Sequence, residues 1–275
     1  MHGAGPGRLP DHASTIDHLV GAALGWKMRP HHRVDAGMKI EIWSDVVCPW
    51  CHIGKRRFEA ALARFPQRDA VEVEWKSFEL DPGAESASAD RPVGERDYAE
   101  RLAVKYGTDL AGAQQMLDTM TGQAAAEGLV FRFDRAPRAN TFDAHQVIHL
   151  AGLRGVQDAV KERFLRGYFT EGEAVGDRDT LVRLATEVGL DADEVRAVLE
   201  EQRFAGAVRA DEAEAAAIGI SGVPFFVIDR KYGVSGAQPA DVLLQALEQA
   251  WAERSPLIAV PGDAAGACGP DGCAV

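Results

Sequence analysis

The stretch that decides the fold reads Lys39-Ile40-Glu41-Ile42-Trp43-Ser44-Asp45-Val46-Val47-Cys48-Pro49-Trp50-Cys51. Residues 39–43 alternate polar and apolar side chains, which predicts a half-buried β-strand. A short turn over residues 44–47 follows, and residues 50–65 carry apolar side chains at helical spacing. The two cysteines are therefore expected between a strand and a helix, at the helix N-terminus.

This position suits a redox-active dithiol. Unpaired backbone N–H groups and the helix dipole favour a thiolate at Cys48. Pro49 lies in the first helical turn, where its missing N–H costs nothing. The two-residue spacing lets Cys51 attack a mixed disulfide formed at Cys48, so we assign Cys48 as the nucleophile and Cys51 as the more buried resolving thiol. Three basic residues on the same helix are expected to form a solvated face: Lys55, Arg56 and Arg57.

Two other interpretations of the cysteine pair stay open. A C-x-x-C pair can be half of a zinc site, which Cys268 and Cys273 would complete. That second pair has four intervening residues and lies in a tail rich in Gly, Pro and Ala. The pair can also be inert and simply buried. The position between strand and helix favours redox chemistry over both, and no metal site is predicted.

The rest of the chain surrounds this start with helices and a few more strands. Residues 71–75 alternate again and predict a second strand, whereas residues 92–218 show almost only helical spacing. Strands return at 224–228 and 232–235, and a helix over 239–251 closes the pattern. A βα(β) start and a ββα finish, separated by a helical block, predict an α/β thioredoxin fold with a large all-helical insertion.

Domain boundaries follow from this pattern. We expect a discontinuous thioredoxin domain over 38–91 and 219–253, interrupted by a helical insertion domain over 92–218. Residues 1–37 contain five of the eight histidines and are expected to be a disordered extension, with Met38 as an alternative start. Residues 254–275 are expected to be a flexible tail that carries the second cysteine pair.

Val223-Pro224 is the second element of the predicted site. It occupies the position at which thioredoxin folds place a cis-proline beside the dithiol. A rigid turn there would leave the backbone of Val223 free to pair with a substrate peptide and would keep metals off the thiols. Gly-Val-Pro is a weak signal alone, since proline is common at the first residue of a strand, but the dithiol adds weight to it.

Composition excludes several other classes of function. The 275 residues carry a formal net charge of -12, which argues against nucleic acid and against an anionic membrane surface as partners. No segment approaches the roughly 20 apolar residues that a membrane helix needs. Four cysteines are too few for a disulfide scaffold in a chain of this length. With no export signal in view, the expected location is the cytoplasm.

Three segments resemble the DsbA-like family of thioredoxin-fold oxidoreductases, and within it the FrnE branch of cytoplasmic oxidoreductases: residues 42–55, 138–145 and 219–226. The resemblance covers about residues 38–251. It implies disulfide oxidase, reductase or isomerase activity with Cys48, Cys51 and cis-Pro224 as the catalytic positions. It implies no cofactor, with glutathione as a candidate co-substrate and protein disulfides or dithiols as partners. The chain is expected to be a monomer or a dimer.

We expect further contacts with substrate from five residues: Pro49, Trp50, Val223, Asn140 and His145. Asn140 can equally cap a helix. His145 and His149, four residues apart, could mimic a metal-binding face, but without a third ligand in view they are expected to be ordinary core or surface histidines.

The same superfamily includes 2-hydroxychromene-2-carboxylate isomerases and kappa-class glutathione transferases, which generally carry serine at the position of Cys48. The alternative function is therefore a glutathione-dependent isomerase of a small aromatic or polyketide-like substrate. Two cysteines disfavour it, because that chemistry needs one hydroxyl or thiol. The tail, Ala267–Cys273, also resembles a cysteine pair seen in some members of the family. Cys268 and Cys273 are accessory redox candidates, either as a relay to Cys48 or as a plain surface pair.

Overall fold

A four-stranded mixed sheet lies at the centre of the computed structural model, which describes residues 37–86 and 95–254. Its order is β2-β1-β3-β4, with β1 parallel to β2 and the other neighbours antiparallel. The strands are β1 (Met38–Ser44), β2 (Val71–Ser77), β3 (Phe225–Ile228) and β4 (Tyr232–Ser235). Each predicted strand is present to within two residues.

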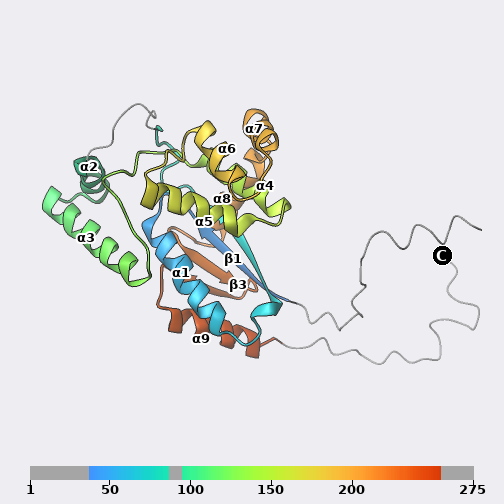
Figure 1. Ribbon diagram of the computed structural model, residues 1–275. Helices are drawn as coiled ribbons and strands as arrows, with labels where there is room; N and C mark the ends of the chain where they lie inside the picture. The colour runs from blue at the N-terminus through green and yellow to red at the C-terminus, as the bar shows by residue number, and fades with distance from the viewer. Residues whose placement is uncertain (1–36, 87–94, 255–275) are drawn as a thin grey trace, which may run out of the picture. The chain divides into compact units, whose positions relative to one another are not determined.

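Two helices belong with the strands in the sequence pattern. Helix α1 (Pro49–Arg64) follows β1, and α9 (Ala240–Ala252) follows β4 and packs against α1. A short 3-10 turn, η1 (Arg68–Ala70), leads into β2. Figure 1 shows α1 and α9 beside the sheet, with most of the inserted helices gathered at its other end.

Every regular element in the described part of the insertion is a helix. Its helices are α2 (Glu95–Tyr106), α3 (Leu110–Ala126), α4 (Phe142–Leu153), α5 (Gln157–Arg166), α6 (Arg178–Thr186), α7 (Ala192–Glu201) and α8 (Ala205–Ala217), with a π-helical turn, η2 (Gly167–Glu171), after α5. Asp109, Asp177 and Asp191 begin α3, α6 and α7, each accepting a hydrogen bond from the backbone N–H three residues on. Each of these carboxylates satisfies a backbone donor that the first turn of its helix leaves unpaired.

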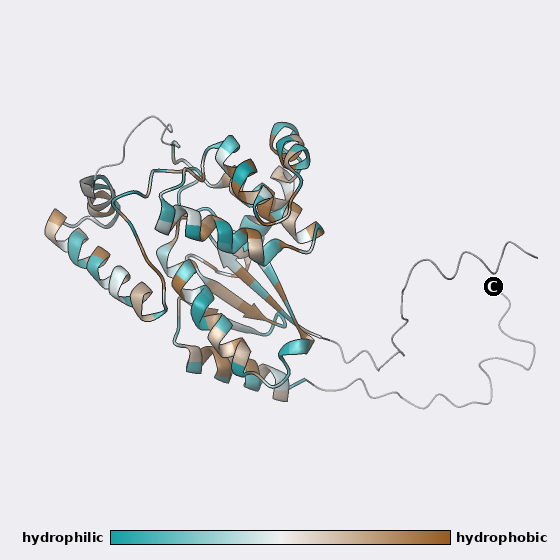
Figure 2. Cartoon of the chain, in the orientation of Figure 1, coloured by the Kyte–Doolittle hydropathy of each residue, from teal (hydrophilic) through white to brown (hydrophobic). Residues whose placement is uncertain are grey.

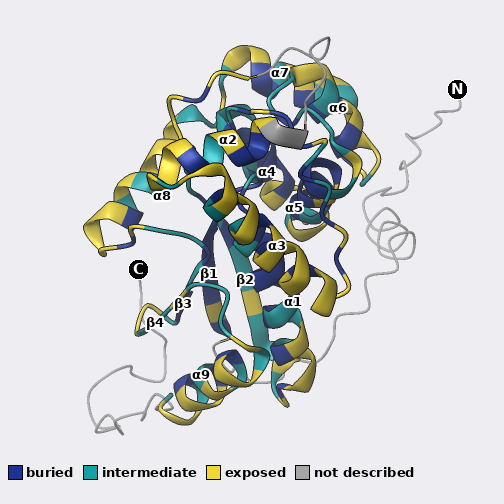
Figure 3. Cartoon of the chain, turned by 90° about the vertical axis from the view of Figure 1, so that its left-hand side faces the viewer, coloured by how far each residue is buried: buried dark blue, intermediate teal, exposed yellow. Residues whose placement is uncertain are grey.

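One apolar core runs from the sheet into the insertion. It joins side chains of β1 and β3, such as Ile42 and Phe226, to side chains of α5 and α6, such as Phe164 and Leu184. Figure 2 shows hydrophobic residues along the strands and a mixture of hydrophilic and hydrophobic residues along the helices. Figure 3 shows β1 largely buried, whereas much of α3 and α9 is exposed. Among the residues described, no helix combines the length and apolar composition that crossing a membrane requires.

The prediction of a half-buried β1 is wrong, because both faces of this strand are covered. Glu41 was expected on the solvent side, yet only 2% of it is exposed. Arg230 forms ion pairs with both Glu41 and Glu214 of α8. A carboxylate that is paired in this way can be buried without leaving an uncompensated charge. The charged residue in the alternating pattern therefore did not mark a solvent-exposed face of the strand.

Asp211 anchors α8 to the sheet. Its backbone oxygen accepts the indole N–H of Trp43 at 2.9 Å, and its carboxylate accepts the backbone N–H of Ser77 at 2.8 Å. Lys76 Nζ and His149 Nε2 lie 2.7 Å and 3.1 Å from the same carboxylate. One buried residue therefore connects the insertion to both parallel strands, to β1 through its backbone oxygen and to β2 through its carboxylate.

Candidate functional site: a buried dithiol at a helix N-terminus

Cys48 and Cys51 lie where β1 leads into α1. Cys48 is the N-cap residue of α1 and Pro49 is its first residue. Both cysteines are free thiols and both are buried, with 4% of Cys48 and 1% of Cys51 exposed. The turn is closed by the backbone N–H of Cys48, which bonds the oxygen of Asp45 at 3.4 Å, and by that of Cys51, which bonds the oxygen of Cys48 at 3.1 Å. The strand–turn–helix placement expected from the sequence is the one observed.

The second predicted element lies against the dithiol although it is 175 residues away in the chain. The Val223–Pro224 peptide bond is cis, and the Sγ of Cys48 lies 3.6 Å from the backbone oxygen of Val223. Gly54 of α1 permits this approach, since a Cβ at that position would lie 2.8 Å from Cγ of Pro224. The structure therefore brings together the three residues to which the sequence assigned catalysis.

A lysine that the sequence analysis did not single out completes the site. Lys161 of α5 is 1% exposed, and its Nζ donates to the backbone oxygen of Ser44 at 3.1 Å. The same nitrogen lies 5.6 Å from the centre of the Trp75 ring. Burial lowers the pKa of Lys161 to about 8, against the opposing effect of Cys51, Asp45 and Cys48. A signal was available, because Lys161 lies three, four and seven residues before buried apolar side chains: Phe164, Leu165 and Tyr168.

The two thiols titrate as a pair. Burial raises the pKa of Cys48 well above its usual value, and the hydrogen bond with Cys51 raises it further. Burial also raises the pKa of Cys51, but the hydrogen bond with Cys48 and the charge of Lys161 outweigh this and lower it overall. The two sulfurs therefore share a hydrogen bond, and burial makes a second negative charge on the pair unfavourable.

His145 is enclosed in the core beside the dithiol turn. Its Nε2 lies 3.3 Å from Oδ1 of Asp45, and both residues are almost completely buried. Asp45 also accepts the backbone N–H of Leu80 at 2.8 Å. Burial raises the pKa of Asp45, yet the hydrogen bond with His145 and the neighbouring charges lower it overall. His145 therefore acts as the partner of a buried carboxylate.

His149 has a different partner from His145, namely Asp211, so the two histidines do not converge on one ligand. In the described part of the chain, no group of three or more His, Cys, Asp or Glu side chains could hold a metal ion. Cys268 and Cys273, which the zinc alternative requires, lie outside the described residues.

Asn140, predicted to contact substrate or to cap a helix, is engaged at the start of α4. Its Oδ1 accepts the backbone N–H of Phe142 at 3.0 Å, and its Nδ2 donates to the oxygen of Pro82 at 3.1 Å.

Between the two cysteines, Pro49 is buried and Trp50 is partly buried against the core.

The prediction of a solvated basic face on α1 is wrong. Lys55 is 2% exposed and lies 3.2 Å from carboxylate oxygens of both Asp158 and Glu162 on α5. Arg57 lies 2.6 Å from Glu127, just after α3, and donates to the oxygen of Ala237 at 2.6 Å. These cations hold α1 against the insertion, because acidic partners from distant segments meet them.

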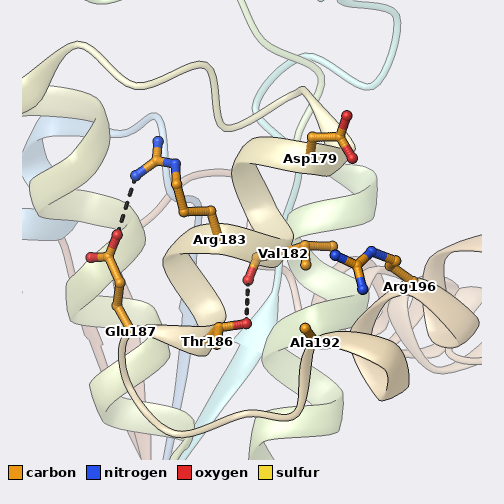
Figure 4. A pocket seen from close by; sticks show the side chains of 7 residues that line it. All are labelled: Asp179, Val182, Arg183, Thr186, Glu187, Ala192 and Arg196. Atoms are coloured by element: carbon orange, nitrogen blue, oxygen red, sulfur yellow. Dashed lines mark hydrogen bonds and ion pairs between the residues drawn. The ribbon is translucent and has the colours of Figure 1, made fainter.

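A surface pocket lies elsewhere, between α6 and α7, and Figure 4 shows its lining. None of the residues assigned to the site is among those that line it. Arg183 is ion-paired with Glu187 at 3.2 Å, and Arg196 is ion-paired with Asp193 at 2.7 Å. Neither arginine is free to bind an anion there, so the pocket is not a candidate active site.

Comparison with known proteins agrees with the fold. A family model described as a DSBA-like thioredoxin domain matches residues 39–248. An uncharacterized protein of Bacillus subtilis, YwbO, is 30% identical over 216 residues, which are 76% of this chain and 94% of YwbO. The crystal structure of a probable DsbA oxidoreductase from Streptomyces coelicolor is 54% identical, covers 86% of this chain and 99% of its own, and has a TM-score of 0.74.

Two more distant structures share the fold. The cytosolic disulfide reductase DsbM from Pseudomonas aeruginosa, solved with GSH, is 20% identical, covers 78% of this chain and 99% of its own, and has a TM-score of 0.53. A 2-hydroxychromene-2-carboxylate isomerase is 14% identical, covers 77% and 95%, and has a TM-score of 0.54. The predicted fold, a thioredoxin domain with an all-helical insertion, is confirmed.

Proposed function

This chain belongs to the family of DSBA-like thioredoxin domains, and from that premise we propose that it is a thiol–disulfide oxidoreductase acting through Cys48 and Cys51. One observation carries the proposal: the two free thiols begin helix α1, and the Sγ of Cys48 lies 3.6 Å from the backbone oxygen next to cis-Pro224. Thiol–disulfide exchange begins when a thiolate attacks one sulfur of a disulfide. The backbone of Val223 lies beside the Sγ of Cys48, where it can hold a substrate peptide while that attack takes place.

In the proposed reaction, Cys48 attacks one sulfur of a substrate disulfide as a thiolate. A bond forms between Cys48 and that sulfur, and the other substrate sulfur leaves with the electron pair of the broken bond. Cys51 then loses its proton and attacks Cys48, which expels the second substrate thiol. Two electrons pass from the dithiol to the substrate. The reverse sequence oxidises a dithiol, and a stop at the mixed disulfide permits isomerisation.

The proposed partners are protein disulfides or dithiols and glutathione, with no cofactor. Pro49, Trp50 and Val223 are proposed to contact the substrate, because they flank the Sγ of Cys48 in sequence or in space. We extend to this chain the cytosolic location of DsbM, and assignment to the FrnE branch is part of the same proposal. The tail cysteines, Cys268 and Cys273, stay accessory redox candidates.

The glutathione-dependent isomerase is not favoured by any feature of the described residues. The fold does not discriminate, since an isomerase and oxidoreductases share it. Two thiols are present where one group would suffice. Asn140 and His145, the candidates for lining its pocket, are bonded to Phe142 and Asp45 instead.

An insulin-reduction assay tests this proposal. The protein is expected to accelerate precipitation of the insulin B chain by dithiothreitol, because the Cys48–Cys51 pair exchanges with the insulin disulfides. The variant Cys268→Ser/Cys273→Ser is expected to retain this activity, since the chemistry is assigned to the other pair. If neither protein accelerated precipitation above the rate of dithiothreitol alone, the proposed function would be wrong.

A further inference from the structure

The chain buries two lysines near the dithiol, and their surroundings differ. Lys55 has three carboxylates around its Nζ: Glu59, Asp158 and Glu162. Lys161 is equally buried, but its hydrogen bond goes to a neutral group, the backbone oxygen of Ser44 at 3.1 Å. Within the described ranges Lys161 forms no ion pair with a carboxylate.

An ammonium that is removed from water needs compensation. The charges that stabilise the protonated form of Lys161 are, in order of effect, those of Cys51, Asp45 and Cys48, whereas Lys55 opposes it. Asp45 is already engaged by His145 and by the backbone N–H of Leu80. The remaining partner is the dithiol, and the effect is mutual, since Lys161 lowers the pKa of Cys51.

We propose that Lys161 is a positioning residue whose buried ammonium, fixed by the backbone oxygen of Ser44 just before the dithiol turn, stabilises the single negative charge of the reduced Cys48–Cys51 pair. The proposal rests on the proposed function and deepens it, because it makes the redox state of the pair depend on the protonation of one buried lysine. Lys161 belongs to the inserted helices, so the insertion takes part in the chemistry of the thioredoxin sheet.

The coupling has a definite proton balance. The reduced site carries one thiol proton and one negative charge on the hydrogen-bonded Cys48–Cys51 pair, together with the Lys161 ammonium. When the pair reduces a substrate disulfide, the Cys48–Cys51 bond forms, the substrate S–S bond breaks, and two electrons move to the substrate sulfurs. The thiolate charge disappears from the site, so Lys161 gives up its proton more readily. The two substrate thiols then gain the one proton of the Cys48–Cys51 pair and one that Lys161 releases.

The first test replaces the ammonium with an apolar side chain of similar length, Lys161→Met. The lowest thiol pKa of the reduced pair is expected to rise by about one to three units, as expected when an opposite charge is removed from a thiolate. The rate of alkylation by iodoacetamide, measured at a series of pH values, reports this pKa. At pH 7 the rate is expected to fall at least about tenfold. Lys161→Arg is expected to keep the profile near that of the wild type.

Lys55→Met is the matched control, because it removes an equally buried lysine whose charge its own carboxylates compensate. Its alkylation profile is expected to stay within about threefold of the wild type. Melting curves identify the variants that fold, because the loss of one partner from a buried ion pair is destabilising. A folded Lys161→Met protein with an unchanged lowest thiol pKa would overturn the proposal. Lys161→Met is expected to be no less stable than the wild type, since it removes a buried charge without leaving a partner carboxylate unpaired.

A measurement on the wild type decides the matter independently of any variant's folding. The ¹³Cε resonance of Lys161, assigned by comparison with Lys161→Arg, is followed against pH in the reduced and the oxidised protein. The pKa of Lys161 is expected to be higher in the reduced protein, because coupling between two ionisations is reciprocal. Equal values in the two states would refute the coupling. Neither readout uses turnover, so a protein without insulin reductase activity would refute the proposed function and leave this test standing.

Discussion

Cys48→Ser is expected to abolish disulfide exchange, and Cys51→Ser is expected to leave the protein covalently attached to its substrate. A hydroxyl at position 48 cannot attack a disulfide at neutral pH, so turnover should fall at least about a thousandfold. In Cys51→Ser the attack by Cys48 still takes place, but no thiol is present to resolve the mixed disulfide. Turnover should fall by a similar factor while the adduct accumulates.

Intact-mass measurement after incubation with oxidised glutathione distinguishes the two variants. Cys51→Ser should gain one glutathione at Cys48, and peptide mapping should locate it there. Cys48→Ser is the matched control, because it keeps one thiol of the same pair, and that thiol is the more deeply buried one. The contrary result would be an adduct on Cys51 in Cys48→Ser and none on Cys48 in Cys51→Ser. The assignment of nucleophile and resolving thiol would then have to be reversed.

Asp211→Ala is expected to have the largest effect on stability among single changes away from the dithiol. The side chain is 5% exposed and accepts from Ser77, Lys76 and His149, which connects α8 to β2 and α4. Its removal leaves the backbone N–H of Ser77 without its acceptor and takes from Lys76 the shortest of its three carboxylate contacts, with only Glu74 and Glu214 left at 3.5 Å. The expected loss in the free energy of unfolding is about 3 kcal/mol or more.

Urea unfolding at neutral pH measures this loss, and Asp193→Ala is the control. Asp193 pairs with Arg196 at 2.7 Å, but its side chain is 93% exposed, so about 0.5 kcal/mol or less is expected.

Burial raises the pKa of Asp211, but His149 and Lys76 lower it overall. Because the pKa of Asp211 is lower in the folded protein than its ordinary value of 3.8, its ionisation stabilises the fold at pH values above 3.8. This contribution is lost as the pH falls through the pKa of the folded state. Asp211→Ala should therefore lose less stability on acidification than the wild type.

Element types and boundaries were predictable because local signals agree along most of the chain. Asn140 was expected either to contact substrate or to cap a helix, and helix α4 begins two residues later, at Phe142. The Oδ1 of Asn140 accepts the backbone N–H of Phe142, which holds the chain in a turn before the helix starts. Cys48, Cys51 and Pro224 were also accessible from sequence, since the motif and its strand–helix context are local.

The surroundings of the dithiol were not predictable in the same way, because they depend on partners that are distant in the chain. Lys161 approaches the dithiol turn from a helix more than 100 residues later, and His145 reaches Asp45 from another. Glu41 and Lys55 looked like solvent-facing charges, and their partners were far away in sequence. A lysine on an apolar helical stripe is the one such feature that periodicity could have identified.

The central claim is that Cys48 and Cys51 form a redox-active pair, and equilibration in glutathione buffers of graded ratio tests it most directly. After acid quenching, alkylation and peptide mass mapping, the fraction of the Cys48–Cys51 disulfide should rise and fall reversibly with the ratio of oxidised to reduced glutathione. Two thiols that remain unlinked at every ratio, or a pair protected by bound zinc, would contradict the claim.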